Sequence, residues 1–206
     1  MTMIGASHGA ADPGPSCVWA DDVLVALAPS RSYSRLIDRS QPTTWRQALS
    51  RPALVLLVVG TATAIAATGR VTLSGIASGM LLWSWVIGIQ FALGAFLIAS
   101  SRSRRVGMPG ALKLFFAAHI PWSLWVAGIG MWAASGLDFS LELAICIGLF
   151  ASVWTAVILA AFNRIALGAT STGSWVLTVV HQCLIWVVAL SYIAWMSGGW
   201  FRLMIW

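Results

Sequence analysis

Two histidines, His119 and His181, lie inside long apolar stretches of this chain. Imidazole is a common ligand of haem iron and related metals, so two helices can present these rings to one tetrapyrrole, or each ring can hold a chlorophyll-type magnesium. The alternative is a hydrogen bond between helices. The apolar stretches hold a single such pair, and the chain has no covalent haem motif. We therefore expect the hydrogen bond and no cofactor, with axial ligation by His119 and His181 as the competing interpretation.

Other side chains that carry chemistry occur in patterns that argue against an enzyme. Cys17, Cys146 and Cys183 lack both metal-ligand spacing and a disulfide framework. Asp138 and Glu142 stand four residues apart at the edge of an apolar stretch, where helix capping explains them better than an acid and base pair does. The chain shows no nucleophile paired with a base and no phosphate-binding loop. We predict a protein without catalytic activity.

Membrane-spanning helices are the elements that must position these side chains. Hydrophobic residues make up 59% of the chain, charged residues 9%, and the mean hydropathy is +0.87, a balance that excludes a soluble domain. A helix needs about 20 residues to cross the hydrocarbon core, and it satisfies its own backbone hydrogen bonds there. Polar breaks leave five stretches near that length, at residues 53–69, 75–100, 111–135, 141–162 and 174–197. The predicted fold is an all-α, polytopic bundle of five transmembrane helices within residues 53–199, followed by a short tail at 200–206.

Basic residues predict the orientation of this bundle, because cations close to the spans are retained on the cytoplasmic side. One side holds Arg31, Arg35, Arg39, Arg46, Arg51, Arg102, Arg104, Arg105, Lys113 and Arg164. The opposite side holds only Arg70 and Arg202. The distribution predicts a cytoplasmic N-terminus and an outside C-terminus in a bacterial inner membrane. It also accounts for the net charge of +6 without a nucleic-acid partner, because the cations are not interleaved with stacking aromatics.

Polar and small residues within the spans indicate where helices face one another. Ser174, Thr178 and His181 share one face of the fifth span, and such a face is expected to turn toward other helices. The remaining polar candidates are Gln90, His119, Ser123, Ser152, Thr155 and Gln182. Small residues four apart occur at Gly60 and Ala64, Gly75 and Gly79, Gly88 and Ala92, and Gly130 and Ala134. We interpret these pairs as sites of close helix packing.

The chain before the first span divides into two segments. Residues 1–20 are rich in Gly, Ala, Pro and Ser, lack a cleavable signal and are predicted to be disordered. Residues 21–52 form a basic interfacial segment, in which Thr43 or Thr44 caps a short helix that lies on the headgroups before Pro52 starts the first span. The residues expected to contact anionic lipid are Arg31, Arg35, Arg39, Trp45 and Arg46. Ordinary juxtamembrane anchoring is the simpler interpretation of the same residues.

A family resemblance rests on the order of these features. Trp45-Arg46 and Arg51-Pro52 lead into the first of five spans, and the second span contains Gly79-x-x-x-Trp83 and Gln90. In this respect residues 29–197 resemble bacterial members of the Yip1 family. The resemblance implies five spans and a cytosolic N-terminus, and the eukaryotic members are associated with membrane trafficking and small GTPases. The eukaryotic signature Asp-Leu-Tyr-Gly-Pro is absent, so neither a GTPase partner nor a functional residue is carried over.

Three classes of function follow from the sequence. The leading hypothesis is a non-enzymatic integral membrane protein that acts through helix packing and lipid or protein contacts, with a membrane-protein partner or as a homo-oligomer. The second is a cofactor-binding or accessory subunit of an electron-transfer or photosynthetic complex, which would use the two histidines. The third is a small transporter, against which we count the lack of internal repeats, broken helices and buried charges.

Overall fold

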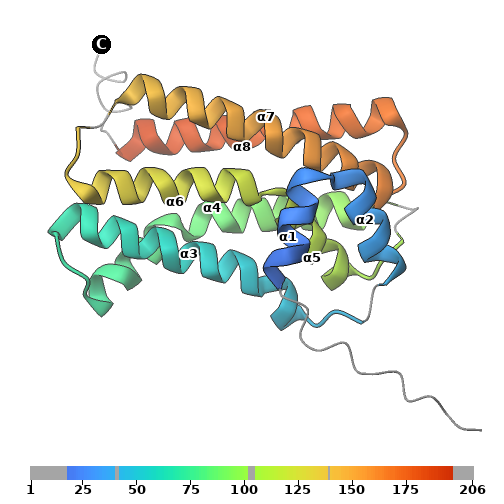
Figure 1. The fold of residues 1–206 in the computed structure, drawn as a ribbon, viewed down its shortest axis with the longest axis horizontal. Helices are drawn as coiled ribbons and strands as arrows, with labels where there is room; N and C mark the ends of the chain where they lie inside the picture. The colour runs from blue at the N-terminus through green and yellow to red at the C-terminus, as the bar shows by residue number, and fades with distance from the viewer. Residues whose placement is uncertain (1–17, 40–41, 102–104, 139, 197–206) are drawn as a thin grey trace, which may run out of the picture.

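The computed structural model describes residues 18–39, 42–101, 105–138 and 140–196, and every regular element within them is a helix. The helices are α1 (Val18–Leu27), α2 (Pro29–Asp38), α3 (Trp45–Thr68), α4 (Leu73–Ser100), α5 (Met108–Ala118), α6 (Ile120–Ser135), α7 (Leu141–Ile165) and α8 (Ser171–Met196). The long helices lie along one axis, and α1, α2 and α5 gather at one end of the bundle (Figure 1). Residues 1–17 of the predicted disordered segment and the tail at 200–206 lie outside the described residues.

Four helices are long and apolar enough to cross a membrane, namely α3, α4, most of α7 and the first part of α8. The α5–α6 pair meets the same test jointly, with a bend of 53° between its two parts, and counting it as one span gives five. The prediction of an all-helical, multi-pass membrane protein is therefore confirmed at four to five spans. The orientation of the termini stays a prediction.

Helix α3 begins earlier than the sequence led us to expect. Thr44 caps it, because the Thr44 hydroxyl accepts the Gln47 N–H at 3.3 Å and the Gln47 side chain accepts the Thr44 N–H at 3.0 Å. The helix then runs without interruption through Pro52. The expectation of a separate interfacial helix that ends where Pro52 starts the span is thus wrong. A proline removes one backbone hydrogen bond, a loss that membrane helices tolerate when their neighbours and caps hold them.

The third predicted span is broken rather than straight. His119 ends α5 and begins α6, and Pro121 is in the first turn of α6. The proline has no N–H to donate, and its ring would collide with the carbonyl group four residues earlier, so the helix cannot continue in a straight line. The expectation that the chain has no broken helix is corrected here. The apolar stretch at residues 111–135 continues across His119, so hydropathy alone gave no sign of the break.

Small residues set the distance between helices at two places. A Cβ built on Gly79 would lie within 2.5 Å of the Gly60 carbonyl oxygen, so α3 and α4 approach closely where these glycines meet. A Cβ on Gly130 would lie 2.7 Å from the Cβ of Ala62, so α6 also packs closely on α3, through the alanine methyl group. Gly88 has open space around it. Its predicted role in packing is therefore not seen among the described residues.

Helices α1 and α2 are part of the folded bundle. Val25 and Tyr33 are fully buried, and the Tyr33 hydroxyl donates to the Leu114 carbonyl oxygen at 3.2 Å. The Trp154 indole of α7 donates to the Ala26 carbonyl oxygen at 2.9 Å. Together these helices help to cover α5, most of whose side chains are buried. Tyr33, which the sequence placed at the membrane interface, instead lies in the core.

Candidate functional site

The two histidines predicted as candidate ligands meet at the centre of the bundle. His119, at the break between α5 and α6, and His181 of α8 are 4% and 3% exposed. Their Nε2 atoms are 3.1 Å apart, and the Nδ1 of His119 lies 2.9 Å from the Phe115 carbonyl oxygen. The break in the helix positions His119, because it turns the last turn of α5 toward α8.

Hydrogen-bond chemistry assigns a tautomer to each neutral ring. A carbonyl oxygen can only accept, so the Nδ1 of His119 carries the hydrogen and its Nε2 is an acceptor. The Nε2 of His181 must then donate to it. This leaves the Nδ1 of His181 as an acceptor, buried and without a partner among the described residues. These hydrogen bonds fix the arrangement of the two rings, but one ring nitrogen, the Nδ1 of His181, has no hydrogen-bond partner among the described residues.

The geometry fits a hydrogen bond better than a ligand site. Two imidazoles on opposite faces of one metal would place their nitrogens about 4 Å apart, because each bond to the metal is about 2 Å long. Here the nitrogens are 3.1 Å apart, and the Phe115 ring packs on both imidazoles with centroid distances of 4.6 and 5.4 Å. Among the described residues no group of three His, Cys, Asp or Glu could hold a metal. Axial ligation of a tetrapyrrole by His119 and His181 would require the rings to separate.

Other buried polar residues form hydrogen bonds between α7 and α8, one turn or more before His181 in the sequence. Asn163 donates from Nδ2 to the Thr178 hydroxyl at 3.1 Å, and Thr178 donates to the Ser174 carbonyl oxygen at 2.8 Å. Ser174, Thr178 and His181 are all buried, so the prediction that this face turns toward other helices is confirmed. Asn163 was not among the predicted polar candidates, because it lies one residue beyond the predicted span at 141–162, whereas α7 continues to Ile165. Its signal was the three-turn spacing from Ser152, another buried polar residue of α7.

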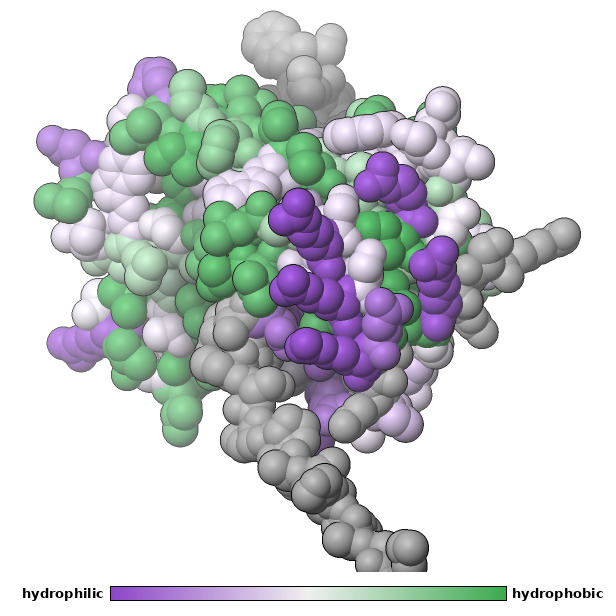
Figure 2. Space-filling model, turned by 45° about the vertical axis from the view of Figure 1, so that its right-hand side comes forward, coloured by the Kyte–Doolittle hydropathy of each residue, from purple (hydrophilic) through white to green (hydrophobic). Residues whose placement is uncertain are grey.

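Unlike the buried histidines, the residues predicted to contact lipid lie on the surface of the protein. We call the end of the bundle that carries α2 the cationic end; its described cations are Arg31, Arg35, Arg39, Arg46, Arg51, Arg105, Lys113 and Arg164. Hydrophilic side chains gather there, whereas much of the remaining surface in this view is apolar (Figure 2). Arg31, Arg35, Arg39 and Arg46 are exposed, as is Trp45 in the first turn of α3.

Backbone contacts bind the chain segments of the cationic end to one another. The Arg51 guanidinium donates to the Lys113 carbonyl oxygen at 2.9 Å, and the Arg105 N–H donates to the Ala166 carbonyl oxygen at 3.1 Å. Arg102 and Arg104 lie outside the described residues. Within the described part of the chain, the candidate sites are thus the buried histidine pair and this exposed cationic end. Comparison with known proteins adds nothing to either, because no family model, no curated protein and no solved structure matches the chain.

Proposed function

We propose that the chain is a non-enzymatic multi-pass membrane protein, a Yip1-like organiser that acts through helix packing and through contacts with anionic lipid headgroups. The cationic end faces the cytoplasm and the C-terminus lies outside, as the positive-inside rule favours. The arrangement of α2 is the observation that carries this proposal. Tyr33 anchors the helix in the core, while Arg31, Arg35 and Arg39 remain exposed on it or at its C-cap.

Electrostatics and pre-organisation support this assignment. Each arginine near an anionic bilayer surface contributes about 1 kcal/mol of attraction. Because α2 is already folded and packed, little backbone freedom is lost when lipid binds. Asp38 is the one acid within α2, so the helix and its C-cap keep a positive net charge. Trp45 adds an exposed indole of the kind found at headgroup level.

The test measures lipid selectivity of the full-length protein in bilayers. Spin-labelled phosphatidylglycerol and phosphatidylcholine report by electron paramagnetic resonance how strongly each lipid associates with the protein. The wild type should prefer phosphatidylglycerol at low salt, and the preference should weaken as the salt concentration rises. Changing Arg31, Arg35 and Arg39 together to Gln should reduce the preference, by up to about fivefold per arginine.

Arg70 provides the matched control. It is exposed and lies in the connection after α3, at the other end of the bundle from α2. Arg70→Gln removes one positive charge and should leave the selectivity of the cationic end unchanged. Equal association of both lipids with the wild-type protein would contradict the proposal.

A further inference from the structure

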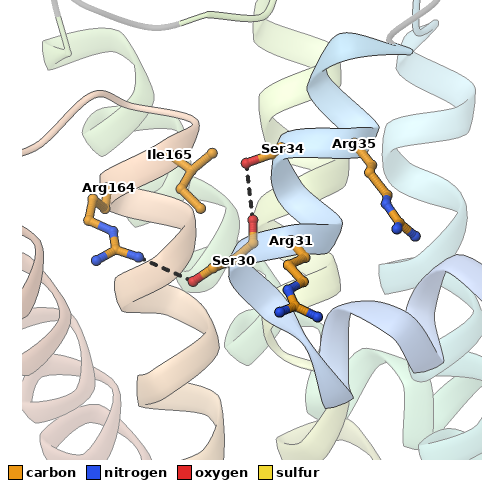
Figure 3. A pocket seen from close by; sticks show the side chains of 6 residues that line it. All are labelled: Ser30, Arg31, Ser34, Arg35, Arg164 and Ile165. Carbon is orange, nitrogen blue, oxygen red and sulfur yellow. Dashed lines mark hydrogen bonds between the residues drawn. The ribbon is translucent and has the colours of Figure 1, made fainter.

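A pocket opens between α2 and α7 at the cationic end, with a volume of about 530 Å³. Ser30, Arg31, Ser34 and Arg35 of α2 line one wall, and Arg164 and Ile165 of α7 line the other (Figure 3). The pocket is shallow and open to the surface, so a group at the membrane surface reaches it without any movement of its walls. From the sequence, Arg164 was expected only to contribute to the orientation of the protein in the membrane. The fold places it beside residues that lie more than a hundred positions earlier in the chain.

The walls of the pocket are held by contacts outside it and within it. The edge-to-face contact of Tyr33 with Phe162, at a centroid distance of 5.9 Å, packs α2 against α7, and both rings are within two residues in sequence of residues that line the pocket. Within it, Arg164 donates from Nη2 to the Ser30 hydroxyl at 3.2 Å, and the Ser34 hydroxyl donates to the Ser30 carbonyl oxygen at 3.1 Å. The site is therefore formed before any ligand arrives, which lowers the entropy cost of binding.

The charge of the pocket calls for an anion. Three of the six residues that line it are arginines, and none is an aspartate or a glutamate. Like charges around one pocket repel one another, and an anion bound between them offsets that repulsion. Arg31 and Arg164 extend on either side of Ser30, whereas Arg35 extends away along the other side of α2 (Figure 3). Direct contacts to a bound group would thus come from Arg31, Arg164 and the Ser30 hydroxyl, while Arg35 adds to the positive field.

We propose that this pocket binds a terminal phosphate monoester, as found in the headgroup of phosphatidic acid. A guanidinium matches phosphate oxygens with two parallel N–H donors, and a serine hydroxyl can donate to a third oxygen. A monoester carries close to two negative charges at neutral pH, since its second pKa is about 6, whereas a phosphodiester headgroup carries one. The larger charge and the additional terminal oxygen suit a pocket with three guanidinium groups. The inference rests on the proposed function, because it needs the cationic end to face lipid headgroups.

The test compares two anionic lipids on the full-length protein. Spin-labelled phosphatidic acid and phosphatidylglycerol are measured in separate bilayers at pH 7.5, and the ratio of their association constants is the readout. The wild type should favour phosphatidic acid. Arg164→Gln and Arg31→Gln should each lower the ratio by about tenfold, the change expected when one charge-assisted hydrogen bond is lost.

Two further variants separate geometry from charge. Arg39→Gln removes the same charge from the C-cap of α2, outside the pocket, and should change the ratio by no more than about twofold. Arg164→Lys keeps the charge but loses the planar fork, so it should lower the ratio nearly as much as Arg164→Gln does. Arg31, Arg39 and Arg164 are all exposed, so the helix content of each variant by circular dichroism should match that of the wild type.

The source of the phosphate is tested by competition. Inorganic phosphate at about 10 mM, with chloride at equal ionic strength as the control, should leave the preference for phosphatidic acid in place if the lipid headgroup is the ligand. Loss of that preference with phosphate alone would assign the site to a free phosphate. Both results support a site for a phosphate group that carries close to two negative charges.

The remaining outcomes distinguish this inference from the proposed function. An anionic preference in which phosphatidic acid and phosphatidylglycerol bind equally overturns the monoester pocket and leaves the proposed function standing. If Arg39→Gln lowers the ratio as much as Arg164→Gln does, the monoester pocket is likewise overturned and the proposed function still stands. A wild-type protein without any preference for anionic over zwitterionic lipid overturns both.

Discussion

At the scale of single residues, the histidine pair shows how one hydrogen bond can organise a membrane core. His119 bonds to its own helix through Nδ1 and to α8 through Nε2, so it links two elements across 62 positions of sequence. Phe115 packs on both rings and limits their rotation. The Nδ1 of His181 has no hydrogen-bond donor in the part of the chain that the structure describes, and such a buried acceptor is unfavourable. The pair therefore makes a modest net contribution to stability.

The first prediction concerns this pair. His119→Ala and His181→Ala should each lower the free energy of unfolding by about 1 kcal/mol, the usual size of such bonds within membranes. The double variant should cost less than the sum of the two, because the shared bond is lost only once. Thermal unfolding in detergent, followed by circular dichroism, measures both effects.

The absorbance spectrum of the same preparations provides the control. A hydrogen-bonded pair predicts a colourless protein. A strong visible band that disappears in either variant would instead support the cofactor-binding class of function.

At the scale of elements, the third span departs most from a simple bundle. Neither part crosses a membrane alone, since the 11 residues of α5 extend about 16 Å and the 16 residues of α6 about 24 Å. Most of α5 is buried between its neighbours, including α1 and α3, so it has little surface left for lipid. The bend at His119 shortens α5 to 11 residues, and α1 and α2 help to cover this short helix. A broken helix is also a feature of transporters, but the described spans carry no buried charge to accompany it.

A second prediction tests the close approach of α3 and α4. Gly79→Ala should lower the free energy of unfolding by about 1–3 kcal/mol, because the added methyl group would meet the Gly60 backbone. Gly88→Ala is the matched control on the same helix, where the added methyl group meets open space. It should be neutral or should stabilise by up to about 1 kcal/mol through higher helix propensity. Thermal unfolding of both variants measures the difference. An equal loss of stability in both variants would show that α4 does not pack closely through Gly79.

At the scale of the whole molecule, charge separates the two ends of the bundle. The cationic end holds eight described cations, whereas Arg70, Asp138 and Glu142 lie in or beside the connections at the other end. Ser140 caps α7 there by accepting the Leu143 N–H at 3.2 Å, and Glu142 stands in the first turn, where the helix dipole favours an anion. This asymmetry predicts the orientation of the protein in its membrane.

A third prediction follows for the C-terminus. With five spans and the cationic end in the cytoplasm, the C-terminus should lie outside. Alkaline phosphatase fused there should therefore be active in bacterial cells, because it folds only in an oxidising compartment. An inactive phosphatase fusion together with a fluorescent C-terminal green fluorescent protein fusion would mean an even number of spans.

The amino-acid sequence by itself determined the helices and much of their polarity. Hydropathy over 20-residue stretches located the long helices, and of the two threonines predicted to cap a helix before the first span, Thr44 is the cap of α3 itself. The period of the α-helix placed Ser174, Thr178 and His181 on one buried face. These inferences succeed because they depend on neighbours within one or two turns, which the sequence displays directly.

Only the tertiary structure decided which helices meet and where. It brought His119 to His181, inserted Tyr33 into the core and placed Arg164 beside Ser30, although these last two lie 134 positions apart. It also revealed the bend at His119 and the continuation of α3 through Pro52. Such contacts depend on the shapes of many side chains packed together, and an apolar sequence in lipid gives little indication of which of several apolar faces will pair.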